Sequence, residues 1–139
     1  MINKYEELVE KAFEARNQAY APYSKFEVGA ALLCADGTIY KGCNIENASY
    51  SATNCAERTA FFHAVSEGKT EFEAIAIVGG QADVQETTFC APCGVCRQVM
   101  REFCNPKSFE IILARNDGDY RVFTLEEMLP MSFGPESLA

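Results

Sequence analysis

The sequence predicts an α/β fold in which helices cover both faces of a mixed five-stranded sheet, a three-layer α/β/α arrangement. Five short apolar runs have the length of strands, and segments of helical length separate the second run from the third and the third from the fourth. The dipeptide Asp36-Gly37 between the first two runs is typical of a tight hairpin. These two strands are therefore expected to be antiparallel, which makes the sheet mixed.

The N-terminal segment is predicted to be an amphipathic helix from residue 2 to about residue 18. Its apolar residues recur at three- and four-residue steps with charged residues between them: Ile2, Tyr5, Leu8, Val9, Ala12 and Phe13. Pro22 ends this helix, because the residue before a proline is pushed out of helical geometry. Two strands follow, over residues 26–35 and 38–43, and the polar segment 44–53 is expected to be a loop.

The middle of the chain alternates between helix and strand. Helices are expected over residues 55–66 and 93–104, and strands over residues 72–78, 109–114 and 120–123. Residues that break helices or strands lie at the ends of these segments: Gly68, Gly79-Gly80, Asn105-Pro106 and Asn116-Asp117-Gly118. Helix and strand are thus expected to separate residue 55 from residue 93.

The C-terminal segment is predicted to begin with a short helix. Thr124 and Glu127 have the spacing of a capping box, and Pro130 ends the segment. Phe133 follows without a periodic apolar partner, which leaves it free for a role outside the core of its own chain.

Length, charge and cysteine usage limit the classes of function. The 139 residues are enough for one domain, residues 1–139, and a 48% hydrophobic share supports one packed core. Twelve basic and twenty acidic residues give a net charge of −8, so we expect no nucleic-acid partner and a small substrate that is not highly anionic. No apolar signal region or membrane span is evident. Seven cysteines without a secretion signal favour a reducing, cytoplasmic location.

Two short stretches are expected to hold one zinc ion between two helix N-termini. Cys93 and Cys96 follow Pro92 at a spacing that places both sulfurs on one side of a first helical turn, where unpaired N–H groups favour thiolate. Cys55 supplies a third ligand at the start of the preceding helix. Three protein ligands leave a fourth position for water, which is the arrangement of a catalytic zinc site.

A glutamate completes the signature of the zinc deaminases, because Cys55-x-Glu57 precedes Pro92-Cys93-x-x-Cys96. Further matching segments extend the similarity over nearly the whole chain: Ala21-Pro22-Tyr23-Ser24, Asn44-Ile45-Glu46-Asn47, Asn54 to Ala60 and Pro92 to Gln98. The chain resembles the small cytidine deaminases that act on free nucleosides. This resemblance implies the fold of that family, one Zn²⁺ per subunit, and hydrolysis of cytidine and 2′-deoxycytidine to the uridines and ammonia, a reaction of pyrimidine salvage.

Glu57 has two interpretations. With Asn54 it has capping-box spacing, in which the carboxylate reaches back to the helix start. Beside a zinc with an open position it is expected to be the catalytic acid/base, since deamination moves protons from the attacking water to the ring nitrogen and the leaving amine. The resemblance also implies that Arg58 bonds to a thiolate. Arg97 is a second candidate for that contact, and a solvated helix surface is the alternative for both arginines.

The resemblance implies that Asn44 and Glu46 hold the ribose 3′-hydroxyl. The carboxylate of Glu46 can accept a hydrogen bond from a sugar hydroxyl and would repel a phosphate, which suits a nucleoside over a nucleotide. The alternative is that both side chains only cap and solvate the loop.

Other contacts with the base and sugar are expected from Phe26 and Tyr50, which otherwise are core residues, and from backbone groups of Ala56 and Ala91. The resembled family is mostly homotetrameric, and its matching phenylalanine stacks on the base bound in an adjacent subunit. Phe133 follows a sequence close to the Leu-Leu-Pro motif of that family. The resemblance therefore implies that it completes a neighbouring site.

Four cysteines remain outside the predicted zinc site. Cys90 has ligand spacing with Cys93 but precedes Pro92 and lies outside the helical turn, so we do not expect it to bind zinc. The other three are expected to be buried and structural: Cys34, Cys43 and Cys104. Two other function classes stay open, a deaminase of another aminopyrimidine or of a polynucleotide, and a non-catalytic zinc-stabilised binding module.

Overall fold

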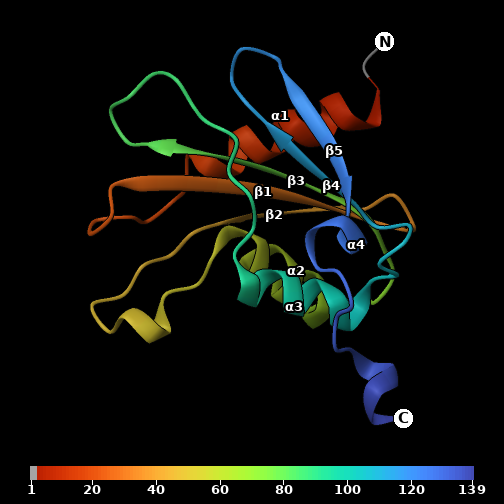
Figure 1. The fold of residues 1–139 in the computed structure, drawn as a ribbon. Coiled ribbons are helices and arrows are strands. Elements are labelled where there is room, and N and C mark those ends of the chain that lie inside the picture. The colour runs from red at the N-terminus through yellow and green to blue at the C-terminus, as the bar shows by residue number, and fades with distance from the viewer. Residues whose placement is uncertain (1–2) are drawn as a thin grey trace.

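The structure is a computed structural model that describes residues 3–139. Helix α1 (Lys4–Arg16) covers one face of the sheet, and helices α2 (Ala56–Ser66) and α3 (Gly94–Phe103) cover the other (Figure 1). The predicted three-layer α/β arrangement is confirmed. The cap of α1 is Asn3, whose side chain accepts a hydrogen bond from the Glu6 N–H, and Ile2, assigned above to this helix, lies outside the described residues.

The sheet has the predicted five strands: β1 (Phe26–Cys34), β2 (Ile39–Cys43), β3 (Phe72–Gln81), β4 (Glu110–Ala114) and β5 (Tyr120–Thr124). Their spatial order is β2-β1-β3-β4-β5. Strands β3 and β4 are parallel, and the other neighbours are antiparallel, so the sheet is mixed. The parallel pair is connected through α3, because two parallel strands need a crossover between them.

Alternate residues of the central strands contribute to two cores on opposite faces. In β3, Ala76 and Val78 pack under α1, whereas Ile75 and Ile77 pack against α2 and α3. Gly42 of β2 allows α2 to lie very close to the sheet, since a methyl group at this position would lie 2.5 Å from the backbone nitrogen of Ala60. The N-terminal half of α2 is therefore seated directly on an edge strand.

Strand β3 is longer than the sequence predicts. The pattern places its end at Gly79-Gly80, but both glycines continue the pairing with β1, opposite Val28 and Glu27. A glycine in a strand often marks a position where another segment approaches closely. This is the case here, because Cys90 lies against Gly79 and Thr87 lies against Gly80.

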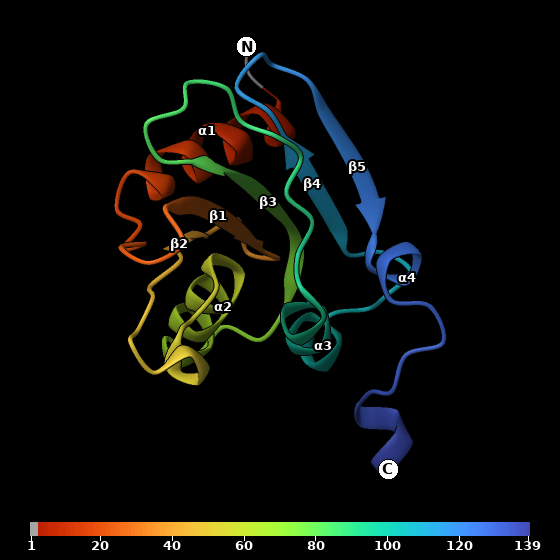
Figure 2. The same cartoon turned by 60° about the vertical axis from the view of Figure 1, so that its left-hand side comes forward.

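The C-terminal segment begins with the predicted short helix, α4 (Leu125–Met128). Its capping box is formed, with the Thr124 hydroxyl 3.2 Å from the Glu127 N–H and the Glu127 carboxylate 2.8 Å from the Thr124 N–H. The chain then extends away from the sheet to a 3₁₀ turn, Pro135–Leu138, that was not predicted (Figure 2). A salt bridge of 2.7 Å between Arg101 and Glu136 attaches this segment to α3.

Within residues 3–139, no helix combines the length and the apolar character that crossing a bilayer requires.

Candidate metal centre

Three cysteine side chains from two helix N-termini converge on one point. Cys55 is the N-cap of α2, Cys93 is the N-cap of α3, and Cys96 is the third residue of α3. The Cys55 and Cys93 sulfurs are 3.8 Å apart, the Cys93 and Cys96 sulfurs are 3.5 Å apart, and all three lie within 4.8 Å of one another. Within the described chain, neither N-cap thiol makes a capping bond to its own helix, so both sulfurs are available to a metal.

The spacing of these sulfurs fits Zn²⁺. A tetrahedral zinc with Zn–S bonds of about 2.3 Å requires sulfur atoms about 3.8 Å apart. Cys90, which has ligand spacing in the sequence, is not a member of this group of three. Three thiolates leave one coordination position open, which is the arrangement of catalytic zinc.

Hydrogen bonds already favour the thiolate form of Cys55. A bond with Cys96 is the largest effect that lowers the pKa of Cys55 to about 5; burial opposes it, and Arg58 adds to it. The Arg58 Nη2 atom lies 3.2 Å from the Cys55 sulfur. The sequence offered this contact and a solvated surface as alternatives for Arg58, and the structure shows the contact.

Glu57 is the second residue of α2 and is only 5% exposed. Burial raises its pKa to about 7, and the negative charge of Cys55 acts in the same direction. A carboxyl group with a pKa near neutrality can both accept and release a proton, as a general acid/base must.

The capping-box interpretation of Glu57 is wrong. The N-cap of α2 is Cys55 rather than Asn54, and the Asn54 amide instead donates to the Thr59 hydroxyl at 3.0 Å. Because the helix begins one residue later than that interpretation requires, Glu57 does not have the N3 position from which a glutamate reaches back to the cap.

A cavity of about 410 Å³ has Glu46 in its wall, together with Tyr23, Ser24, Tyr50 and Thr53. The Glu46 carboxylate accepts hydrogen bonds from the backbone N–H groups of Tyr23 (3.0 Å) and Ser24 (3.1 Å) and from the Ser24 hydroxyl. These bonds, led by the hydroxyl of Ser24, lower the pKa of Glu46. The cavity therefore has a fixed, ionised carboxylate in one wall, and Tyr50, 78% exposed, at its rim.

Asn44 is buried and joins the loop before α2 to strand β1. Its side-chain amide donates to the Phe26 carbonyl at 2.8 Å, and its side-chain oxygen accepts from the Val28 N–H at 2.9 Å. A primary amide has two N–H donors, so one of them remains for another partner. Asn44 thus positions the segment that carries Glu46, a role that the sequence did not show.

The other predicted contact residues are distributed around this centre. Phe26 is the first residue of β1, Ala56 is the first residue of α2, and Ala91 lies in the exposed loop before Cys93. Phe133 is 59% exposed on the C-terminal segment, which the Gln98 side chain holds through the Phe133 carbonyl at 2.9 Å.

Arg97 does not contribute to the thiol cluster in the way that its position after Cys96 suggested. Its guanidinium group donates to the backbone carbonyls of Pro92 and Met128, and the first of these bonds is 2.8 Å long. Arg97 therefore connects the loop before α3 to the end of α4.

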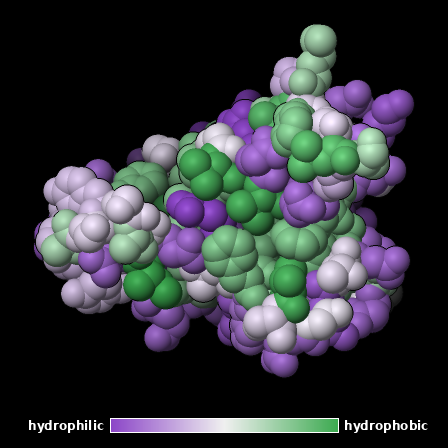
Figure 3. All heavy atoms as spheres, turned by 90° about the horizontal axis from the view of Figure 1, so that it is seen from below, coloured by the Kyte–Doolittle hydropathy of each residue, from purple (hydrophilic) through white to green (hydrophobic). Residues whose placement is uncertain are grey.

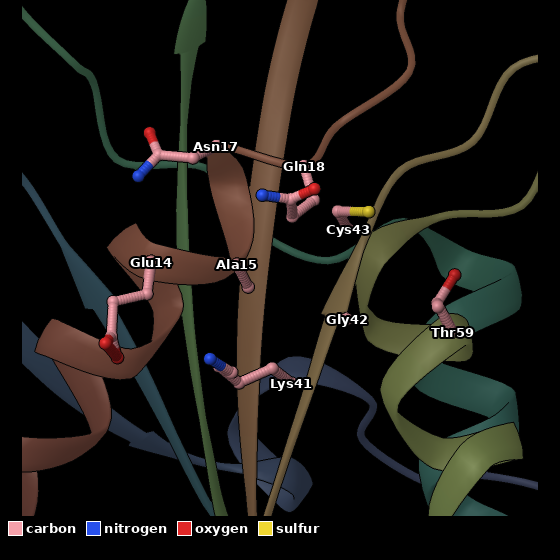
Figure 4. Close-up of a pocket in the computed structure, with 8 residues that line it drawn as sticks. All are labelled: Glu14, Ala15, Asn17, Gln18, Lys41, Gly42, Cys43 and Thr59. Atoms are coloured by element: carbon pink, nitrogen blue, oxygen red, sulfur yellow. The ribbon is translucent and has the colours of Figure 1, made fainter.

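Another cavity, of about 370 Å³, lies between the C-terminal end of α1 and the edge strand β2 (Figure 4). It is lined by Glu14, Ala15, Asn17, Gln18, Lys41, Gly42, Cys43 and Thr59. This lining contains none of the three clustered thiols and does not include Glu57. The cavity is thus separate from the candidate metal centre.

Comparison of the sequence with known protein families identifies the family to which the chain belongs. Residues 2–111 match the family model described as the cytidine and deoxycytidylate deaminase zinc-binding region. The chain belongs to this deaminase family. Membership makes it a hydrolytic deaminase with zinc as its cofactor, and the thiol cluster is the group of side chains that can hold one ion.

Individual members of the family are similar over almost the whole chain. The cytidine deaminase of Sporosarcina psychrophila is 54% identical over 134 residues, which cover 96% of this chain and 94% of that protein. The cytidine deaminase of Halalkalibacterium halodurans is 50% identical over 131 residues, 94% of this chain and 95% of that protein. The crystal structure of cytidine deaminase from Burkholderia pseudomallei has a TM-score of 0.84 at 48% identity and covers 95% of this chain and 100% of that one.

Proposed function

We propose that this protein hydrolyses cytidine and 2′-deoxycytidine to uridine and 2′-deoxyuridine with release of ammonia, as a step of pyrimidine salvage. The observation that carries the proposal is a buried carboxyl group, Glu57, beside three converging thiols with the spacing of zinc ligands: Cys55, Cys93 and Cys96. These thiols would hold a zinc ion, which would supply a Lewis acid for the attack of water.

Glu57 is the catalytic acid/base of this reaction. Its carboxylate takes a proton from the attacking water and delivers it to the ring nitrogen N3. The same carboxylate then takes the proton of the hydroxyl group newly formed at C4 and delivers it to the leaving amine, which departs as ammonia. Burial supports this role, because it brings the pKa of Glu57 to about 7 and lets the group act in both directions at neutral pH. Arg58 bonds to Cys55 and offsets part of the negative charge of the thiolates.

The nucleoside is held by groups on both sides of the metal centre. The backbone N–H of Ala56, the first residue of α2, contacts the polar edge of the pyrimidine, since the first N–H groups of a helix have no partner within it. The backbone carbonyl of Ala91, in the loop before α3, contacts the same edge. Phe26 lies beside the base, and Tyr50 closes the sugar side from the rim of the cavity that contains Glu46.

Asn44 and Glu46 bind the ribose 3′-hydroxyl in this proposal. Among residues 3–139, the Asn44 amide donates only to the Phe26 carbonyl, which leaves its second N–H for the sugar, and the Glu46 carboxylate retains acceptor capacity beyond its bonds to Tyr23 and Ser24. The fixed negative charge of Glu46 disfavours a 5′-phosphate nearby. A free nucleoside is therefore the preferred substrate over a nucleotide.

We further propose that the protein is a homotetramer in which Phe133 covers the base bound in a neighbouring subunit. Apolar side chains gather on the face formed by α2 and α3 (Figure 3). There, Phe62 is 50% exposed and Val95 is 57% exposed, along a groove of about 440 Å³. Contiguous apolar surface of this kind is typical of an interface. The Phe133 segment is attached to α3 beside it, so a second copy on this face places Phe133 near another metal centre.

A cytoplasmic location is supported by the state of the cysteines. All seven lie within the described residues and are unpaired, and three of them must stay reduced to bind zinc.

Substrate assays with the zinc-loaded protein test this proposal. Loss of the cytidine absorbance is measured in parallel with 2′-deoxycytidine, dCMP, the aminopyrimidine nucleoside blasticidin and single-stranded DNA. We expect turnover of the first two and at least tenfold lower kcat/KM for dCMP. Absence of cytidine turnover by protein with one bound zinc per chain would contradict the proposal, and preferential turnover of blasticidin or DNA would assign a different substrate to the same centre.

A further inference from the structure

On the face of the sheet that packs against α2 and α3, strand β3 has no side chain at Gly79. Ile75, Ile77 and Gly79 alternate with residues that face α1, so they lie on the side of α2 and α3. The two isoleucines fill the core on that side, whereas Gly79, paired with Val28, contributes no side chain. Side chains from other segments can therefore approach the backbone of Gly79 closely.

Cys90 and Phe26 occupy this space. A methyl group placed on Gly79 would lie 3.0 Å from the Cys90 sulfur, 3.1 Å from the Cys90 Cβ atom and 3.1 Å from Cε1 of Phe26. The thiol and the aromatic ring therefore lie over the same glycine. A backbone hydrogen bond of 3.3 Å from the Thr88 N–H to the Gly79 carbonyl fixes the segment that carries Cys90.

Cys90 is a partly buried side chain of the core that also contains Ala56. Burial raises the pKa of Cys90 to about 11, and the negative charges of Glu57 and Cys55 contribute in the same direction. Cys90 and Cys55 pack against the same core cluster, which contains Ala56. At neutral pH it is a small, neutral and weakly polar side chain outside the set of metal ligands.

The proposed function defines which edge of the base such a side chain meets. Cytosine has polar groups at O2, N3 and N4 and an apolar edge at C5 and C6. Glu57 and the backbone of Ala56 and Ala91 take the polar groups, so the apolar edge faces the apolar side chains that remain. Cys90 lies with Phe26 over Gly79 and directly precedes Ala91, and the proposed function places both Phe26 and Ala91 at the base. C5 is the ring atom next to the reacting C4.

We propose that Cys90, packed with Phe26 over Gly79, forms the wall against C5 of the pyrimidine and sets the size of the substituent accepted there. This inference rests on the proposed function. One methyl group more or less in such a pocket changes kcat/KM by roughly 10- to 200-fold. The side chain at position 90 is thereby a specificity-determining residue that neither binds zinc nor transfers a proton.

The test is the ratio of kcat/KM for 5-methylcytidine to that for cytidine, measured on the same zinc-loaded preparation so that the folded fraction cancels. Cys90→Ala enlarges the pocket and should raise the ratio by about tenfold. Cys90→Val reduces the space and should lower it by a similar factor. Cys90→Ser preserves the size and should leave the ratio within about twofold of the parent.

Cys104→Ala is the matched control, because Cys104 is a buried cysteine of the same core at the far end of α3. We expect it to leave the ratio unchanged. Equal ratios in the parent, Cys90→Ala and Cys90→Val proteins would overturn the inference while cytidine turnover upholds the proposed function. An equal shift in Cys104→Ala would also overturn it, since general loosening of the core would then be the cause. Loss of all cytidine turnover in the parent would instead remove the proposed function.

Discussion

The metal centre and the C-terminal segment represent opposite ways of placing a functional side chain. Cys55, Glu57 and Cys96 lie in the first turns of two helices that pack on the sheet, and Glu57 is almost completely buried. Phe133 lies on an extended segment, 59% exposed, and is held mainly through its backbone carbonyl. The reacting groups are thus assembled by one chain, whereas the proposed stacking residue depends on a second copy.

Removing a proposed zinc ligand is the strongest test of whether one chain assembles the metal centre. Cys93→Ala should lose the bound zinc and all measurable deamination, because it deletes one of three thiolates. Cys90→Ser should retain one zinc per chain. Metal analysis of both proteins after dialysis checks this, and equal zinc loss in the two variants would show that the ligand set is different.

Replacing the proposed acid/base group, Glu57, should abolish proton transfer without affecting zinc binding or folding. Glu57→Gln keeps the size of the side chain and the zinc, but kcat should fall by ~10²–10⁴-fold because an amide cannot transfer the protons. Zinc content, circular dichroism and cytidine turnover are the measurements. A turnover rate close to that of the parent would mean that Glu57 is not the acid/base.

Substitution of Phe133 tests whether the exposed C-terminal segment contributes to substrate binding. Stacking of a base on an aromatic ring contributes ~1–3 kcal/mol, so Phe133→Ala should lower kcat/KM by about ten- to a hundredfold. Zinc content and thermal stability should not change, since the ring is exposed in its own chain.

Mixed oligomers identify the subunit that the ring serves. Co-assembly of Glu57→Gln chains with Phe133→Ala chains should regenerate activity if the ring acts in a neighbouring site, because some sites then combine an intact Glu57 with an intact Phe133. Hybrids that form, as shown by mass spectrometry, but have only the summed activity of the two mutants would place Phe133 in its own site or in none.

The smallest expected effect is at Glu46, which concerns specificity. Partly exposed charge interactions contribute ~0.2–1 kcal/mol. Glu46→Gln should therefore reduce the preference for cytidine over its 5′-monophosphate by only about two- to fivefold. The two kcat/KM values, measured at low ionic strength, give this ratio. An unchanged ratio would remove the charge of Glu46 from the explanation of nucleoside preference.

Short-range geometry predicted only part of the site, and Cys55, which lies 38 positions from Cys93, was added to that part through the signature of the zinc deaminases. Cys93 and Cys96 are three residues apart at a helix start, and this spacing is enough to bring two sulfurs to one side. The helices, the five strands and the capping box at Thr124 follow from local patterns for the same reason.

Contacts between distant segments were not predictable in this way. Gly79 has the local character of a strand terminator, but it continues the strand because Cys90 and Phe26 cover it. The partners of Arg97 are carbonyl groups of the loop before α3 and of the end of α4, which only the folded chain brings within reach. Asn44 likewise bonds to β1 across 16 or more positions of the sequence.

The two cysteine N-caps have a consequence for how the protein acquires its active form. Serine or aspartate at an N-cap typically contributes ~0.5–2 kcal/mol to a helix, and neither Cys55 nor Cys93 makes this bond within the described residues. A zinc ion bound to both sulfurs would hold the two helix starts together and would supply stabilisation in place of the missing capping bonds. We therefore expect the metal-depleted chain to be more open to proteolysis near residues 55 and 93 than the zinc-loaded chain.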